Sequence, residues 1–152
     1  MLKRIREMKD QDGFTLIELM VVVLIIAILI AIAIPTFLGL RERAQNRAAT
    51  SDLRNALTAA KAYYTDGDTF VGFDAAEGLS VEPSLTWSDA AGSTTAIGVG
   101  EVTATAVVLT HQSDSDDWFC AIDQNGLSSV RTTPAGEADT VALCMAVGTS
   151  AI

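Results

Sequence analysis

The sequence is poor in the side chains from which most active sites are built. Of its 152 residues, one is histidine and two are cysteines, Cys120 and Cys144, which do not form a Cys-x-x-Cys pair. No Ser-His-Asp arrangement, phosphate-binding loop or metal-binding helix motif occurs, so neither catalysis nor zinc binding is indicated. His111 lies on an alternating segment and is predicted to be a surface residue. We therefore predict that the chain is not an enzyme and needs no cofactor.

Positive charge is also scarce. Ten Lys and Arg residues stand against 19 Asp and Glu, which gives a formal net charge of −9. Beyond Tyr64 the only lysine or arginine is Arg131, so the second half is strongly acidic. Because phosphate binding relies on Lys and Arg, no nucleic-acid partner is specifically predicted. The other basic residues flank an apolar run, which by the positive-inside rule places the N-terminus in the cytoplasm and the acidic half outside.

Residues 14–40 form that apolar run, in which Glu18 is the only charge. As a helix the run would be ~40 Å long, enough to cross a bilayer. In an ordinary secretory signal the cleavage site follows the apolar stretch. Here the best small-residue site, Gly13, precedes it, so the helix is predicted to survive processing. A carboxylate at membrane depth costs at least ~2.5 kcal/mol, which makes Glu18 a functional-site hypothesis.

Glu18 requires a partner, and cleavage between Gly13 and Phe14 would create one. The free α-amino group of Phe14 would have an ordinary pKa of about 8 and would be largely protonated at neutral pH. Glu18 is four residues further on, and its side chain is not expected to fold back onto its own first nitrogen. A neighbouring subunit, staggered along the axis, could instead present its Phe14 amine to this carboxylate. In low dielectric each charge needs the other.

Residues 9–18 resemble the class III signal sequence of type IV prepilins, and the resemblance continues through Pro35 to Gln45. It implies a prepilin peptidase that cleaves after Gly13 and methylates Phe14. It also implies a single-pass precursor in the cytoplasmic membrane that a pilus assembly platform builds into an extracellular filament. In type IVa-like pilins, the proline that matches Pro35 marks a stretch of helix, here residues 27–35, that loosens on assembly.

After the leader, the sequence reads as one long helix from residue 14 to about residue 64. Pro35 and Gly39 interrupt the pattern and predict a kink near residues 32–35. Beyond the apolar run, small and apolar residues recur every three to five positions and predict a helix face that lies on a sheet. Gly67 is the predicted C-terminal cap.

An α+β head is predicted for residues 66–152. After a variable loop at 70–91, in which a short helix or strand is allowed for, period-two patterns predict strands at 94–99, 101–110, 117–123, 127–132 and 140–147. Asn125-Gly126 between two of these runs predicts a hairpin. The expected fold is a long helix packed on an antiparallel sheet of about four strands. The predicted segments are the cleaved leader 1–13, the transmembrane and filament-core helix 14–40, the amphipathic helix 41–65 and the head.

Two further sites are weaker hypotheses. Cys120 and Cys144 in an exported domain indicate one disulfide, which would tie the last strand to the hairpin; two buried free thiols are the alternative. Asp114, Asp116 and Asp117 are candidate calcium ligands. Their spacing does not match an EF-hand, and a solvated acidic turn is favoured over a metal site.

The features together favour a structural protein, a type IVa-like pilin that forms a homo-oligomeric helical filament used in twitching motility, adhesion or DNA uptake. The first alternative is a pseudopilin of a type II secretion-like system, or a minor or competence pilin. A second alternative is a membrane-anchored binding domain that never polymerises. That alternative leaves Glu18 and the Gly13-Phe14 junction without a purpose.

Overall fold

The structure is a computed structural model that describes residues 13–133 and 140–146. Most of the predicted leader, and residue 147 of the last predicted strand, lie outside these ranges. Contacts divide the chain into two compact units, Met1–Leu40 and Arg41–Ile152, and each unit is described by itself.

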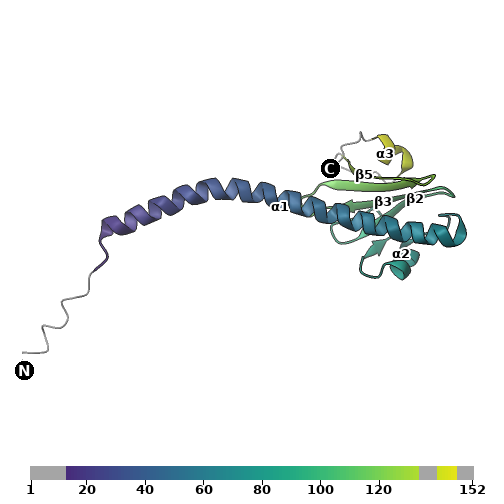
Figure 1. Cartoon of the computed structure of the whole chain (residues 1–152), viewed down its shortest axis with the longest axis horizontal. Helices are drawn as coiled ribbons and strands as arrows, with labels where there is room; N and C mark the ends of the chain where they lie inside the picture. The colour runs from purple at the N-terminus through teal and green to yellow at the C-terminus, as the bar shows by residue number, and fades with distance from the viewer. Residues whose placement is uncertain (1–12, 134–139, 147–152) are drawn as a thin grey trace, which may run out of the picture. The chain divides into compact units, whose positions relative to one another are not determined.

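Helix α1, Leu16–Gly67, is a single helix of 52 residues that runs through Pro35 without a break (Figure 1). By length and composition it could cross a membrane. Its first part follows from a run of aliphatic residues with no glycine before Gly39. The kink at Pro35 and Gly39 stays a prediction. At the other end, the residue in the left-handed region is Asp68, with φ 52°, rather than the predicted cap Gly67. The Asp68 N–H donates to the Tyr64 carbonyl at 2.7 Å and closes the last turn.

The second unit holds a five-stranded sheet in the order β1-β2-β3-β4-β5. Strand β1 pairs with β2 in parallel, and the other neighbours are antiparallel. The predicted antiparallel sheet of about four strands is therefore slightly wrong, because the sheet is mixed and has one more strand; the α+β class is confirmed. The strands are β1, Trp87–Ser88; β2, Ile97–Val102; β3, Ala106–Gln112; β4, Trp118–Gln124; and β5, Leu127–Thr133.

The alternating segment 101–110 is not one strand, as predicted, but the end of β2, a turn and most of β3. Thr103 causes the turn: its N–H donates to the Ala106 carbonyl at 2.8 Å, and its hydroxyl accepts the Ala106 N–H at 3.0 Å. Threonine hydroxyls compete with strand pairing through such local bonds, and an alternating pattern does not reveal them.

The predicted hairpin at Asn125-Gly126 is confirmed between β4 and β5. Both residues have positive φ, 54° and 81°, as a two-residue type I′ turn requires. Asp123 supports the turn by accepting the Gly126 N–H at 3.1 Å.

The last predicted strand is instead a short helix, α3, Val141–Ala146. Thr140 begins it: its hydroxyl accepts the Leu143 N–H at 3.2 Å and its carbonyl the Cys144 N–H at 2.9 Å. A short apolar run has no reliable period, so an N-terminal cap decided between strand and helix. The loop predicted at 70–91, in which a short helix or strand is allowed for, contains helix α2, Ala75–Val81, which Asp74 caps.

Alternation along the central strands divides the core into two layers. Val107 and Leu109 of β3 pack with Leu53 and Ala56 of α1 in the larger cluster. Val108 instead joins the smaller cluster, which comprises Val108, Cys120, Ile122 and Cys144. Successive strand side chains point to opposite faces, so α1 covers one face of the sheet and α3 contributes to the other.

The disulfide between Cys120 and Cys144 is present, with a Cα–Cα distance of 6.0 Å. It joins β4 to α3 rather than to a last strand. Residues 134–139, which separate β5 from Thr140, lie outside the described ranges.

We expect the Cys120→Ser/Cys144→Ser variant of the full-length chain, in detergent, to lose about 3 kcal/mol of unfolding free energy, because the cross-link closes a loop of 24 residues in sequence. Urea unfolding measures the loss. Reducing the wild-type chain should produce the same loss, whereas reductant should leave the double variant unchanged. Equal stability of wild type and variant would contradict a stabilising role.

Candidate functional site

The candidate site lies at the start of α1. Gly13 and Phe14 precede the helix, which begins at Leu16 rather than at the predicted Phe14. Phe14 is 82% exposed, and a Cβ at Gly13 would meet no atom within 4 Å. The peptide bond between them therefore lies outside the helix, next to the exposed Phe14 side chain.

Thr15 and Glu18 form a reciprocal cap on the first turn. The Glu18 N–H donates to the Thr15 hydroxyl oxygen at 3.3 Å. In return, Glu18 Oε2 accepts the Thr15 N–H at 3.1 Å and the Thr15 hydroxyl at 2.7 Å. This is the capping box, Ser/Thr-x-x-Glu, with Thr15 as the N-cap. A carboxylate there is also stabilised by the positive end of the helix dipole.

This arrangement adds a role for Glu18. Its side chain folds back to Thr15, because the third helical residue lies over the capping residue, and within the described residues it makes no hydrogen bond to the Phe14 nitrogen. The signal was available, since Thr15-x-x-Glu18 precedes an apolar run and is a recognised helix-start pattern. Only one carboxylate oxygen of Glu18, Oε2, takes part in these hydrogen bonds, however. Within the described residues Oε1 has no hydrogen-bond partner and Glu18 has no ion pair, so the charge itself is not neutralised.

Between Glu18 and Leu40 the helix offers an apolar surface in which Thr36 is the one residue with a polar side chain. Every large apolar side chain in residues 14–40 is between 47% and 82% exposed. Such a continuous apolar surface requires lipid or protein around it. Glu18 is therefore a charged group with one free oxygen at the edge of a surface that water does not favour.

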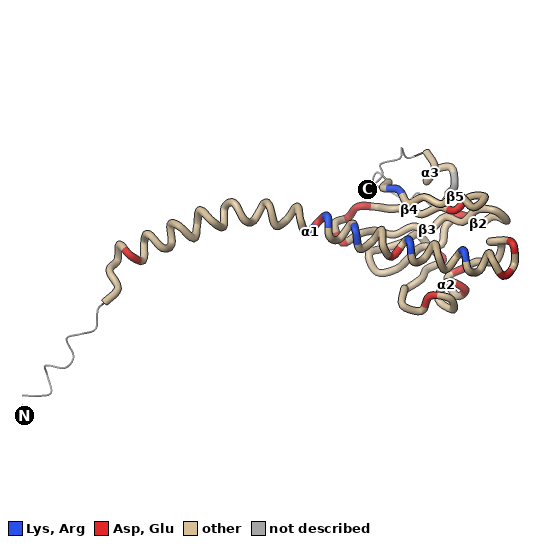
Figure 2. Tube along the Cα trace, in the orientation of Figure 1, with Lys and Arg blue, Asp and Glu red and all other residues tan. Residues whose placement is uncertain are grey.

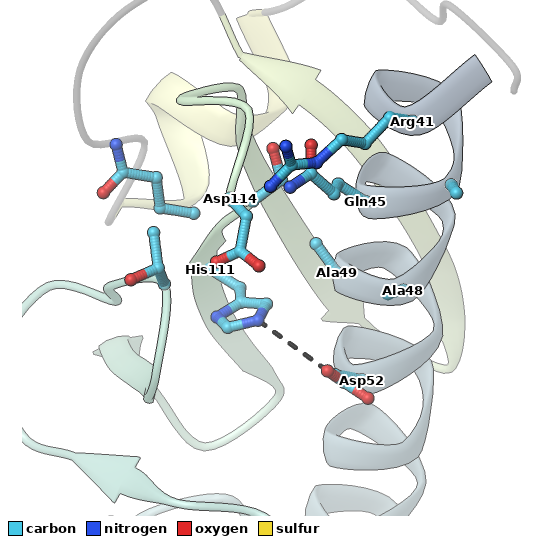
Figure 3. A pocket seen from close by; sticks show the side chains of 11 residues that line it. Arg41, Gln45, Ala48, Ala49, Asp52, His111 and Asp114 are labelled. Carbon is cyan, nitrogen blue, oxygen red and sulfur yellow. Dashed lines mark ion pairs between the residues drawn. The ribbon is translucent and has the colours of Figure 1, made fainter. Parts of the chain in front are cut away.

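A second concave site lies in the Arg41–Ile152 unit, between α1 and the end of β3. It is a pocket of ≈ 350 Å³ whose lining includes Arg41, Asp52, His111 and Asp114 (Figure 3). The prediction that His111 is a surface residue is wrong, because its side chain is 7% exposed. Its Nδ1 lies 3.3 Å from the Ala96 carbonyl oxygen and its Nε2 lies 3.8 Å from Asp52 Oδ2. The alternation of β3 indicates that His111 is buried, because every second residue from Val107 through Leu109 to His111 lies on the face that α1 covers.

The three candidate calcium ligands take different roles. Asp117 accepts from the Asn46 side chain at 2.6 Å, and Asp116 from the Gln112 side chain at 3.2 Å. Asp114 lines the pocket near His111. Among the residues that the structure describes, no group of three or more His, Cys, Asp or Glu is placed to hold a metal ion. The turn is held by amide side chains, which supports the alternative of a solvated turn.

Comparison with known proteins identifies the class. The family profile described as the prokaryotic N-terminal methylation motif matches residues 8–34. The major component PilA4 of the type IV wide pilus of Thermus thermophilus is 32% identical over 128 residues, which cover 82% of this chain and 92% of that protein. The chain therefore belongs to the type IV pilin family.

Other relatives match a smaller part of the chain. The type IV major pilin PilA of Myxococcus xanthus is 46% identical over 61 residues, 40% of this chain and 28% of that protein, so the chain spans less than a third of that relative. The type II secretion system core protein G of Vibrio cholerae is 46% identical over 55 residues, 34% of this chain and 38% of that protein. No solved structure matches the chain.

The capping box predicts different effects for two substitutions. Thr15→Ala should remove the hydroxyl that accepts the Glu18 N–H, at a cost of ~1 kcal/mol, so this amide should exchange with solvent roughly fivefold faster. Glu18→Gln should leave the rate nearly unchanged, because glutamine also completes a capping box. Hydrogen exchange of the full-length chain in micelles measures both. The Leu109 amide in the core of the sheet is the internal control, and equal rates in all three proteins would contradict the cap.

Proposed function

We propose that this chain is the structural subunit of a type IV pilus and polymerises through its N-terminal helix. The observation that carries the proposal is the apolar surface of residues 14–40. At its start lies Glu18, which has one hydrogen-bonded carboxylate oxygen and one without a partner within the described residues. The match to a pilus major component along 92% of that protein supports it. In the filament, the helices of neighbouring subunits would replace the lipid around this surface.

The steps from precursor to filament would follow from the order of the segments along the chain. The precursor would sit in the cytoplasmic membrane with residues 1–13 inside. A prepilin peptidase would cut after Gly13 and methylate Phe14, and an assembly platform would move the processed chain into the filament. Residues 14–40 would then form the filament core, and the head of residues 66–152 would form its surface. Pro35 and Gly39 would allow the helix to loosen on assembly.

Glu18 would connect processing to assembly. Its Oε2 completes the cap of its own helix, and Oε1 is free to accept from a protonated amine. Cleavage produces such an amine on Phe14, one residue before Thr15. If a staggered neighbour presents this amine, the Glu18 carboxylate caps its own helix and also neutralises the Phe14 amine of that neighbour. A precursor with an uncut leader has no amine at this position, so it could not complete the pair.

The main alternative is a pseudopilin of a secretion system. The similarity to core protein G extends over 55 residues, whereas the similarity to the wide-pilus component includes most of the head. This difference favours the pilus. A permanent membrane anchor, the second alternative, would need neither a protease-accessible Gly13-Phe14 bond nor a charged residue at membrane depth.

Gly13→Val should leave uncut precursor in the membrane, because the protease would meet a branched side chain where glycine has none. Mass spectrometry of membrane and filament fractions measures this. The wild-type filament subunit should begin with N-methyl-Phe14. A filament subunit that retains Met1 would refute processing at this site.

Glu18→Ala and Glu18→Gln should both abolish filaments although the chain still inserts and is processed. Removing one side of a buried ion pair typically costs ~3–5 kcal/mol, and a filament repeats this cost at every subunit. Yield of sheared filaments from cells without wild-type subunits measures the effect. Thr15→Ala is the matched control, because it damages the cap and keeps the charge, and it should still assemble. Normal filaments from Glu18→Gln would show that Glu18 acts only as a cap.

A further inference from the structure

Nearly all Lys and Arg residues of the Arg41–Ile152 unit lie on α1, which also carries Glu42 and Asp52. Five arginines or lysines, at 41, 43, 47, 54 and 61, lie on α1, and the next lysine or arginine in the sequence is Arg131. Eleven Asp and Glu residues lie between Lys61 and Arg131. Figure 2 shows the basic residues along α1, and acidic residues at the end of α1 and around α2.

Arg43, Arg47 and Arg54, here called the basic stripe, share one face of the helix. At 3.6 residues per turn they point within about 40° of one another. All three side chains are exposed, and within the described residues they form no ion pair. Lys61 continues the same face but already pairs with Asp123 at 3.3 Å. The stripe therefore presents positive charge that the head does not neutralise.

The start of the stripe borders a hollow. Arg43 and Arg47 line a pocket of ≈ 380 Å³ together with Asn46, Phe119 and Thr132. The hollow thus combines two guanidinium groups with an amide and a hydroxyl, all suited to bind carboxylates. It lies near the first turns of α1 in this unit.

Three acidic residues without an ion pair among the described residues lie at the other end of α1, whereas Asp114 lies near Arg41. Asp66, Asp68 and Glu77, here called the acidic end, are exposed, and within the described residues none forms an ion pair. Aromatic contacts of Tyr64 with Phe70 and of Tyr63 with Phe73 hold this segment against the last turns of the helix. From Arg43 to Asp66 the helix rises ~35 Å, so the two charge groups lie at opposite ends of the head.

We propose that the acidic end of one subunit docks on the basic stripe of a second copy of this chain, an inference that rests on the proposed filament function. The two patches are different surfaces of the same chain, so the contact is heterologous. Such a contact generates an open helical assembly rather than a closed dimer. The charges also repel the wrong pairing, stripe on stripe, and so fix the direction in which heads stack.

Charge reversal with rescue tests the pairing. Arg43→Glu/Arg47→Glu and Asp66→Lys/Glu77→Lys should each lower the yield of sheared filaments at least about tenfold, because like charges would meet at every contact. The chain that carries all four changes should recover most of the yield. The acidic side chains of Asp66 and Glu77 make no hydrogen bond within the described residues, so their reversal breaks no side-chain hydrogen bond of the head. Protection of Cys120 and Cys144 from alkylation checks folding in every variant.

Arg41→Glu is the matched control. Arg41 lies about 160° around the helix from Arg43, on the side that lines the His111 pocket. Its reversal should leave filament yield near wild type. Wild-type yield from either reversed pair, or failure of the fourfold variant with an intact disulfide, would overturn the proposal. The proposal would also be overturned if a reversed pair formed normal filaments that differed from wild type only in retaining less added DNA at low salt. Absence of filaments from the wild-type chain would count against the proposed function instead.

Discussion

An apolar helix tolerates a carboxylate only where something neutralises it. Glu18 meets this requirement halfway: one oxygen caps the helix through Thr15, and the other has no partner within the described residues. A chain of this kind is stable at the membrane boundary, where water reaches Glu18, and becomes stable away from water only with a second charged group. The proposed filament supplies that group from a processed neighbour, which makes cleavage a condition for assembly.

A buried carboxylate in the head shows the same requirement met within one chain. Asp123 is 3% exposed and pairs with Lys61 at 3.3 Å. It also accepts the Gly126 N–H and, at 2.7 Å, the Ser128 hydroxyl. These bonds tie α1 to the β4–β5 hairpin. The charge of Asp123 is neutralised within its own chain, so it needs no partner from another subunit. The contrast with Glu18 explains why one carboxylate serves the fold and the other is free for assembly.

The sequence predicted those parts of the fold that depend on local chemistry. Asn125-Gly126 requires positive φ and gave the hairpin correctly, and the long helix followed from composition. Errors arose where a single side-chain bond decided the structure. The Thr103 hydroxyl divides the alternating 101–110 segment, and Thr140 caps a helix in a run that also fits a strand. Strand β1 could not be predicted, because two residues carry no period and its pairing with β2 depends on the tertiary fold.

The sequence indicates which residues form the candidate site, and their roles in cleavage and assembly stay predictions; it does not indicate the geometry. Gly13, Phe14 and Glu18 were identified from the apolar run and its one charge. The apolar run marks Glu18 as a charge, whereas the capping box depends on Glu18 as a hydrogen-bond acceptor, so the run alone does not predict the box. His111 was misplaced because the alternation of β3 was not followed to its end. In both cases the pattern was present in the sequence, and its meaning depended on which face of the element was buried.

A zero-length cross-link in intact filaments tests the central claim most directly. An apolar carbodiimide should join the Phe14 amine of one chain to the Glu18 carboxylate of another, and denaturing gels should then show dimers and higher species. Mass spectrometry of the joined peptides would identify the two residues. We expect Glu18→Asp, if it assembles, to give fewer cross-links because its side chain is shorter. Filaments in which the amide joins Phe14 and Glu18 only within single chains, without dimers, would contradict neutralisation by a neighbour.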